Sequence, residues 1–221
     1  MNAVELRSLT RILGNRPVLD ALDLAVETHA RVALLGPSGS GKTTLLRLVA
    51  GLDAPDAGAV FLDGVEMNTA RRLVPPHERN LGFVFQSTAL WPHMTVAQNV
   101  VYGARGLDKL ARQQRLDSLL SLFEIEGTAS RYPDQISGGE ARRVAFARAL
   151  ATDPRLLLLD EPFTNLDEAL KGRLMTLVDA ATRDRTVLFV THDEAEAAQL
   201  GDRVVRMAEG RVVEYPGREA I

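Results

Sequence analysis

Residues 36–44 read GPSGSGKTT, and the apolar stretch VALL at 32–35 leads directly into them. This is the G-x-x-x-x-G-K-[ST] pattern of a phosphate-binding loop, between a buried strand and a helix expected to run from residue 42 to about residue 50. Its glycines let successive backbone N–H groups point at one anion, and the helix adds its positive dipole end. The alternative is a glycine-rich turn that binds nothing, but the strand, spacing, lysine and threonine all match the pattern. The stretch predicts an α/β fold that binds a nucleoside triphosphate.

The nine loop residues form the first set of predicted nucleotide contacts. Lys42 can reach the β- and γ-phosphates, and the hydroxyl of Thr43 can bind Mg²⁺. The full set is Gly36, Pro37, Ser38, Gly39, Ser40, Gly41, Lys42, Thr43 and Thr44. Because kinases, GTPases, helicases and transport ATPases all share this loop, other motifs have to decide between them.

The composition is ordinary for a soluble globular protein and excludes several classes. The 221 residues suffice for one large α/β domain with an inserted subdomain. The 26 Lys and Arg against 29 Asp and Glu give a net charge of −3, which favours no general attraction to nucleic acid or anionic lipid. Cysteine is absent, so disulfides and thiolate metal sites are excluded, which suits the cytosol. No signal peptide or membrane-spanning run is visible, so we expect any membrane role to depend on a partner.

Strand patterns occur at both ends of the chain. Residues 4–9 and 22–26 predict an antiparallel β portion at the N-terminus, and Asp63 with Gly64 predicts a hairpin turn. Buried strands are predicted at 156–159 and 186–190. A final hairpin is expected to pair residues 204–207 with residues 212–213.

Residues 87–150 have a helical pattern instead. Thr95 and Gln98 form a T-x-x-Q capping box. A core-facing helical stripe consists of Leu116, Leu119, Leu120 and Phe123. We therefore predict an α/β nucleotide-binding core from residues 1–86 and 151–221, a mixed sheet flanked by helices. A helical subdomain at 87–150 is inserted into it, and the whole chain 1–221 is one domain.

Two adjacent acids follow the apolar stretch 156–159. Asp160 can hold Mg²⁺ directly or through water, and Glu161 can orient and polarise an attacking water. Two solvated acids at a strand end are common by themselves. After four leucines in a chain with a phosphate loop, the catalytic interpretation is favoured.

A second anion-binding turn is predicted at ISGGE, residues 136–140. Ser137 and Glu140 make an S-x-x-E capping box, which by itself indicates only a well-capped helix. Gly138 and Gly139 behind the serine, however, expose N–H groups at a helix N-terminus. One chain with two such sites suggests that two copies enclose one triphosphate.

Together these motifs resemble the ATP-binding subunit of an ABC transporter. The resemblance rests on GPSGSGKTT, a Gln at 86, ISGGE, LLLLDEP, TNLD at 164–167 and a His at 192, in this order, and it covers essentially the whole chain. It implies a P-loop NTPase that uses ATP and Mg²⁺, hydrolyses ATP and pairs with a second ATP-binding subunit, identical or different. It also implies an integral membrane permease as partner, at the cytoplasmic face of the membrane, and no nucleic acid.

The resemblance assigns further roles by position. Ser137, Gly138 and Gly139 would contact the γ-phosphate held by the other subunit, Glu140 would place a carboxylate near this phosphate site, and Asp167 would lie across the interface. Gln86 ligates Mg²⁺ or water and senses the permease, while His192 holds the γ-phosphate and the water near Glu161. A single His or Gln is by itself more often structural or solvated.

Residues 75–100 resemble importers that are served by a substrate-binding protein. Many of these carry a C-terminal regulatory β domain, whereas this sequence stops at Ile221, so we expect a member without it. Trp91 and Met94 fit either a permease contact or burial under the helical insertion.

This sequence departs from the family pattern at two positions. Glu140 stands where a Gln is usual, and Leu13 stands where an aromatic side chain normally stacks on adenine. We expect Leu13 to cover the base. The alternative is that Leu13 belongs to the core and that the base lies against Ile12 or Val18. An exporter subunit, a soluble non-transport ABC ATPase and a P-loop kinase are the competing interpretations; the last would lack ISGGE and the arrangement of Asp160, Glu161 and His192.

Overall fold

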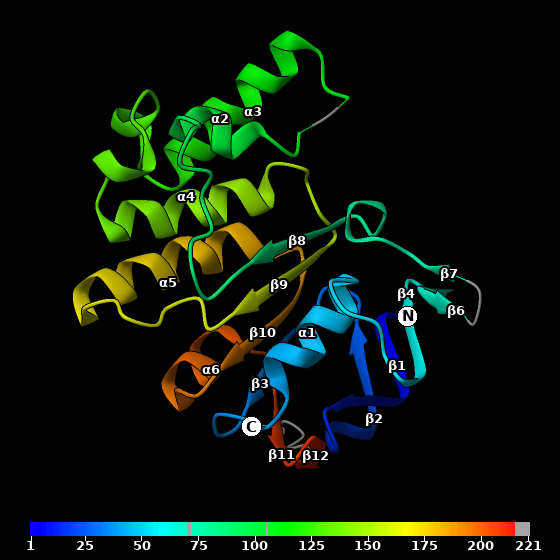
Figure 1. Ribbon diagram of the computed structural model, residues 1–221. Helices are drawn as coiled ribbons and strands as arrows, with labels where there is room; N and C mark the ends of the chain where they lie inside the picture. The colour runs from blue at the N-terminus through cyan, green and yellow to red at the C-terminus, as the bar shows by residue number, and fades with distance from the viewer. Residues whose placement is uncertain (70–71, 105, 215–221) are drawn as a thin grey trace.

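The computed structural model describes residues 1–69, 72–104 and 106–214, which form three sheets with helices packed between and around them (Figure 1). The strands are β1 (Asn2–Leu13), β2 (Arg16–Glu27), β3 (Arg31–Leu35), β4 (Ala57–Leu62), β5 (Val65–Glu66), β6 (Asn68–Thr69), β7 (Arg72–Leu73), β8 (Leu81–Val84), β9 (Leu156–Asp160), β10 (Thr186–Thr191), β11 (Arg203–Ala208) and β12 (Arg211–Glu214). The α-helices are α1 (Lys42–Ala50), α2 (Val96–Val101), α3 (Lys109–Leu122), α4 (Gly138–Leu150), α5 (Glu168–Thr182) and α6 (Glu194–Leu200). Short 3₁₀ turns lie at Pro76–Glu78, Glu126–Thr128 and Pro133–Gln135.

The central sheet has the strand order β12-β11-β3-β10-β9-β8. Its strands run parallel except β12, which pairs antiparallel with β11 in the predicted final hairpin. Alternate residues of β3 pack on opposite faces, Val32 and Leu34 on one and Ala33 and Leu35 on the other. A sheet covered on both faces explains why its strands are continuously apolar. The prediction of an α/β fold with a mixed sheet is confirmed.

The second sheet, β2-β1-β4-β5, is the predicted antiparallel portion. Helix α1 lies between the two sheets, and its leucines share one apolar cluster with both (Figure 1). The Asp63–Gly64 turn joins β4 to β5, with φ of 48° and 78° at the two residues, as a tight hairpin requires. β1 and β2 are longer than predicted, because bulges carry their pairing beyond the alternating apolar positions.

Helices α2 to α6 cover the opposite face of the central sheet (Figure 1). The predicted capping boxes at Thr95 and Ser137 both form, and the predicted stripe on α3 is buried. α4 packs on β8 and on α2, so the helices of 87–150 share an apolar cluster with the sheet. The division into a core and an inserted subdomain stays a prediction, and residues 215–221 of it lie outside the described part. Within the described part, no helix combines the length and apolarity needed to cross a membrane.

The C-terminal end of α1 is fixed by Arg79, a buried side chain. Its guanidinium donates to the carbonyls of Leu48 and Val49, at 3.0 and 2.8 Å, and to that of Val74 at 2.8 Å. Burial lowers the pKa of Arg79 to about 10. Because Leu48 and Val49 lie in the last turn of α1, where carbonyls lack partners within the helix, Arg79 anchors the helix whose other end carries the phosphate loop.

Candidate nucleotide site

The phosphate loop joins β3 to α1 and lines a hollow of about 290 Å³. Gly39 and Gly41 have φ of 83° and 98°, and a Cβ at Gly41 would lie 2.6 Å from the carbonyl oxygen of Val18. Among the described residues, no side chain caps the first turn of α1, so its N–H groups are available to an anion. The residues lining the hollow are Val18, Ser38, Gly39, Gly41, Lys42, Thr43, Thr44, Gln86 and Glu161.

Lys42 is folded into the loop. Its ammonium donates to the carbonyls of Gly36 and Pro37, at 2.7 and 2.8 Å, and to the hydroxyl of Ser40 at 3.3 Å. Burial lowers its pKa, while the nearby carboxylates of Glu161 and Asp160 oppose that effect. Phosphate oxygens are stronger acceptors for a cation than carbonyls, so the ammonium has reason to exchange partners when a phosphate arrives.

The predicted metal ligands Thr43 and Asp160 are in contact. The Thr43 hydroxyl donates to a carboxylate oxygen of Asp160 at 2.8 Å. Asp160 ends β9, is buried, and has a pKa raised by that burial. A buried carboxylate beside a hydroxyl is an oxygen donor set, which fits Mg²⁺.

The carboxylate of Glu161 lies beside the other two predicted catalytic side chains, Gln86 and His192. One carboxylate oxygen accepts from the amide of Gln86 at 3.2 Å and from the hydroxyl of Thr164 at 3.3 Å. The other lies 3.7 Å from Nδ1 of His192. Glu161 has a φ of 44°, and its N–H donates to the carbonyl of Val190 at 3.0 Å. A left-handed backbone is uncommon for a residue other than glycine, and here it turns the carboxylate out of the strand toward the hollow.

The segment after β8 is fastened to α4 by two arginines. Arg142 donates to the carbonyls of Phe85 and Gln86, at 2.9 and 2.7 Å. Arg148 donates to those of Thr88 and Ala89, at 2.9 and 2.7 Å. These four hydrogen bonds connect α4 to the backbone of Gln86 and of the residues around it.

The second anion-binding turn predicted at residues 136–140 (the signature turn) does not line the phosphate hollow. Ser137 is the N-cap of α4, and Glu140 closes its capping box. A Cβ at Gly139 would meet the side chain of Leu170 at 2.5 Å, so the turn sits against the start of α5. Asp167 caps α5 by accepting from the N–H of Leu170 at 3.0 Å. Residues 137–140 and Asp167 thus form a second group, separate from the residues around Lys42.

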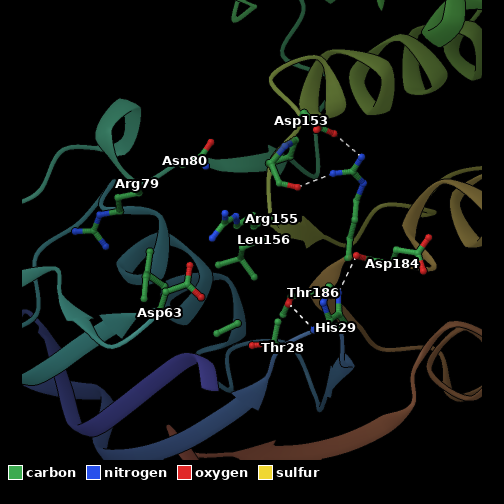
Figure 2. A pocket seen from close by; sticks show the side chains of 14 residues that line it. Thr28, His29, Asp63, Arg79, Asn80, Asp153, Arg155, Leu156, Asp184 and Thr186 are labelled. Carbon is green, nitrogen blue, oxygen red and sulfur yellow. Dashed lines mark hydrogen bonds and ion pairs between the residues drawn. The ribbon is translucent and has the colours of Figure 1, made fainter. Parts of the chain in front are cut away.

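A different hollow, of about 410 Å³, lies where strands β3, β9 and β10 begin (Figure 2). Arg185 pairs there with Asp153 at 2.7 Å, and the ring of His29 donates to the carbonyl of Asp184 at 2.8 Å. None of the predicted site residues lines it. Its contacts hold the starts of neighbouring strands together, and the phosphate loop is at the other end of those strands.

The profile of the ABC transporter family matches residues 19–164. The chain belongs to this family. The sulfate/thiosulfate import ATP-binding protein CysA of Caulobacter vibrioides is 46% identical over 95% of this chain and 63% of its own length. The Fe(3+) ions import ATP-binding protein FbpC of Pseudomonas fluorescens is 42% identical over 97% of this chain and 61% of its own. The chain therefore spans about three fifths of the length of these relatives.

Solved ABC cassettes share the fold. An ATP-binding cassette, solved as a dimer in a post-hydrolysis state with ADP and Pi, superposes with a TM-score of 0.85 at 31% identity. The alignment covers 99% of this chain and 100% of that cassette. The resemblance to the ABC family predicted from the motifs is confirmed.

Leu13, in place of the aromatic expected of an ABC subunit, ends β1 at the turn before β2. Its side chain is 52% exposed, so the alternative that Leu13 belongs to the core is wrong. Ile12 is exposed as well, while Val18 lines the phosphate hollow. Its exposure leaves Leu13 accessible to a ligand, and its role in covering the base stays a prediction.

Leu13→Tyr is expected to tighten ATP binding by about two- to tenfold, because aromatic stacking adds roughly 0.5–1.5 kcal/mol beyond area burial. The melting temperature should stay unchanged, since the side chain is exposed. Ile12→Tyr, at the neighbouring exposed position, is the matched control and should leave affinity unchanged, because adjacent strand residues face opposite ways. Calorimetric titration of both variants measures this, and equal affinities in the two would show that the base lies elsewhere.

Sequence reasoning missed the support around His192. Lys171 on α5 pairs with Asp193, and with the buried Glu196 at 2.9 Å. Glu196 in turn accepts from the hydroxyl of Thr191 at 2.5 Å. The residues on both sides of His192 are thereby tied to α5, whose N-cap is Asp167. Lys171 and Glu196 lie in separate helices, α5 and α6, and no spacing in the sequence indicates that they form an ion pair.

Proposed function

We propose that the chain is the ATP-hydrolysing subunit of a membrane importer and works as one half of a head-to-tail dimer. The observation that carries this proposal is the separation of two anion-binding groups within one chain, the phosphate hollow at Lys42 and the turn at Ser137. Each then completes a site on the other copy. The dimeric state of the solved cassette and the import function in the names of the relatives support it.

The residues of the hollow fit ATP with Mg²⁺. Lys42 and the N–H groups of the loop would hold the β- and γ-phosphates, and Thr43, Asp160 and Gln86 would hold the metal. Bound Mg²⁺ would neutralise charge on the phosphates. The remaining loop residues, Gly36 to Gly41 and Thr44, shape this cradle.

Hydrolysis in this proposal is attack of water on the γ-phosphorus. The water oxygen bonds to the γ-phosphorus while Glu161 accepts a proton from the water. The bond between the γ-phosphorus and the β-γ bridging oxygen breaks, and ADP and phosphate leave. His192 and Gln86, both at the Glu161 carboxylate, hold the γ-phosphate and position the water. The turn at 137–139 of the second copy contacts the same γ-phosphate, and Asp167 lies across the interface.

The permease contact is proposed at the edge strand β8. A groove of about 360 Å³ runs along it, and the rings of Trp91 and Tyr102 meet there, with their centres 4.2 Å apart and their planes tilted by 39°. The guanidinium of Arg148 lies 4.9 Å from the centre of the Trp91 ring and holds the segment after Gln86. A permease helix in this groove would touch Arg148, and through this side chain a movement of α4 would reach the permease. Trp91 and Met94 are both half-buried, so neither is wholly a surface residue.

The import direction carries further proposals. The subunit would bind the cytoplasmic face of the membrane through its permease, and a substrate-binding protein would deliver the cargo. The second ATP-binding subunit is a copy of this chain or a homologue. The similarity to import subunits over nearly the whole of this chain supports these proposals.

A mixture of two inactive variants tests the shared sites. Lys42→Ala removes one phosphate loop and Ser137→Arg blocks one signature turn, so a mixed dimer keeps one intact site. We expect activity in the mixture that neither variant shows alone. A mixture with no more activity than its parents, and no ATP-dependent dimer by light scattering, would contradict the proposed head-to-tail sharing.

A further inference from the structure

The Ser137 hydroxyl, which the proposed function directs at a γ-phosphate, is already engaged within the chain. It donates to a carboxylate oxygen of Glu140 at 2.8 Å, and the N–H of Ser137 donates to the same oxygen at 2.7 Å. A serine hydroxyl has a single proton to donate. While the hydroxyl donates its proton in the hydrogen bond to Glu140, it has only lone pairs to present to an incoming phosphate.

A second capping box in the same chain shows what glutamine does at the equivalent position. At Thr95 and Gln98, the Thr95 N–H donates to the side-chain oxygen of Gln98 at 2.9 Å, and the Gln98 N–H donates to the Thr95 hydroxyl at 3.3 Å. Among the contacts of the described residues, the Thr95 hydroxyl donates to no side chain. Of these two boxes, the one that ends in a carboxylate accepts a hydrogen bond from the hydroxyl of its cap residue, and the one that ends in an amide does not.

Charge acts in the same direction. The two hydrogen bonds from Ser137 lower the pKa of Glu140, so this carboxylate is ionised at neutral pH. Arg131 and Arg143 lie near this carboxylate. The guanidinium of Arg143 also forms an ion pair with the carboxylate of Glu124, at 3.5 Å. A negative charge at the N-terminus of α4 offsets the positive end of the helix and the nearby arginines. It thus weakens the attraction of the turn for a phosphate.

We propose that Glu140 is a positioning residue that holds the Ser137 hydroxyl and opposes ATP-driven closure of the dimer. This rests on the proposed function, in which the turn meets the γ-phosphate of the second copy. Closure then requires the hydroxyl to leave Glu140 and donate to the phosphate. The energy of that exchange sets the ATP concentration at which two copies join.

The experiment measures the dimer dissociation constant with ATP and Mg²⁺ by analytical ultracentrifugation, in a Glu161→Gln background that prevents turnover. We expect Glu140→Gln to tighten the dimer by about tenfold or more, because a hydrogen bond to a charged acceptor and a like charge are both removed. The gain should shrink in a Ser137→Ala background and should fall with added salt. In the chain without Glu161→Gln, Glu140→Gln should lower the ATP concentration needed for half-maximal hydrolysis.

Gln98→Glu is the matched control. It makes the reverse exchange in the Thr95 box, away from the phosphate sites, and should leave the dimer constant unchanged. Melting temperatures of the Glu140→Gln and Gln98→Glu variants show whether each box still caps its helix. A dimer in the Glu161→Gln protein that Glu140→Gln fails to tighten would overturn the role of Glu140 alone. No ATP-dependent dimer with either residue at 140 would overturn this role and the shared site together.

Discussion

Glu161→Gln is expected to lower ATP hydrolysis by roughly 10²–10⁴-fold, the contribution typical of a general base, while ATP and Mg²⁺ still bind. The amide is isosteric and keeps contact with Gln86 and Thr164, but it cannot accept the proton of the attacking water. Steady-state phosphate release measures the loss, and calorimetric titration measures the retained binding.

Glu126→Gln is the control for this substitution, since it makes the same change at an exposed position in the short turn Glu126–Thr128. Its turnover should match that of the unmodified chain. Near-normal turnover in Glu161→Gln would remove the carboxylate from the role of base, and the water would then have to be activated by another group.

Lys42→Ala is expected to weaken ATP binding by about 10–100-fold, because a charge-assisted hydrogen bond to phosphate contributes roughly 1.5–3 kcal/mol. Lys42 also bonds to the carbonyls of Gly36 and Pro37, so its removal leaves these carbonyls to water or to a rearranged loop. Calorimetric titration of ATP and a melting curve separate the two effects.

Lys42→Met separates charge from packing, because it keeps a long apolar stem in the loop and removes only the ammonium. We expect it to bind ATP as weakly as Lys42→Ala but to melt nearer the unmodified chain. ATP affinity unchanged in both variants would contradict the assignment of the hollow to the triphosphate.

Local patterns predicted α1 and its loop closely. The glycine turn fixes where the helix starts, and Gly51, with a φ of 74°, ends it in the left-handed conformation that glycine allows. The Ser137 and Thr95 boxes were predictable for the same reason, since all their partners lie within three residues. The position of Asp160 and Glu161 was predictable because both acids follow directly on the apolar residues of one strand.

Contacts between distant segments were not predictable in this way. Arg142 and Arg148 bind carbonyls 56 to 60 residues earlier in the chain, and a helix pattern does not indicate which loop its arginines meet. The exposure of Leu13 follows from its place at a hairpin end, which the bulges in β1 and β2 determine. The capture of the Ser137 hydroxyl by Glu140 depends on rotamers, so the sequence showed the box and not its consequence.

The measurement that tests the central claim most directly is the molar mass of the Glu161→Gln protein in solution by light scattering. With saturating ATP and Mg²⁺ the account predicts twice the 24.1 kDa of one chain, and with ADP or without nucleotide it predicts 24.1 kDa. A mass of 24.1 kDa with ATP bound at micromolar protein would contradict the claim that two copies enclose the nucleotide.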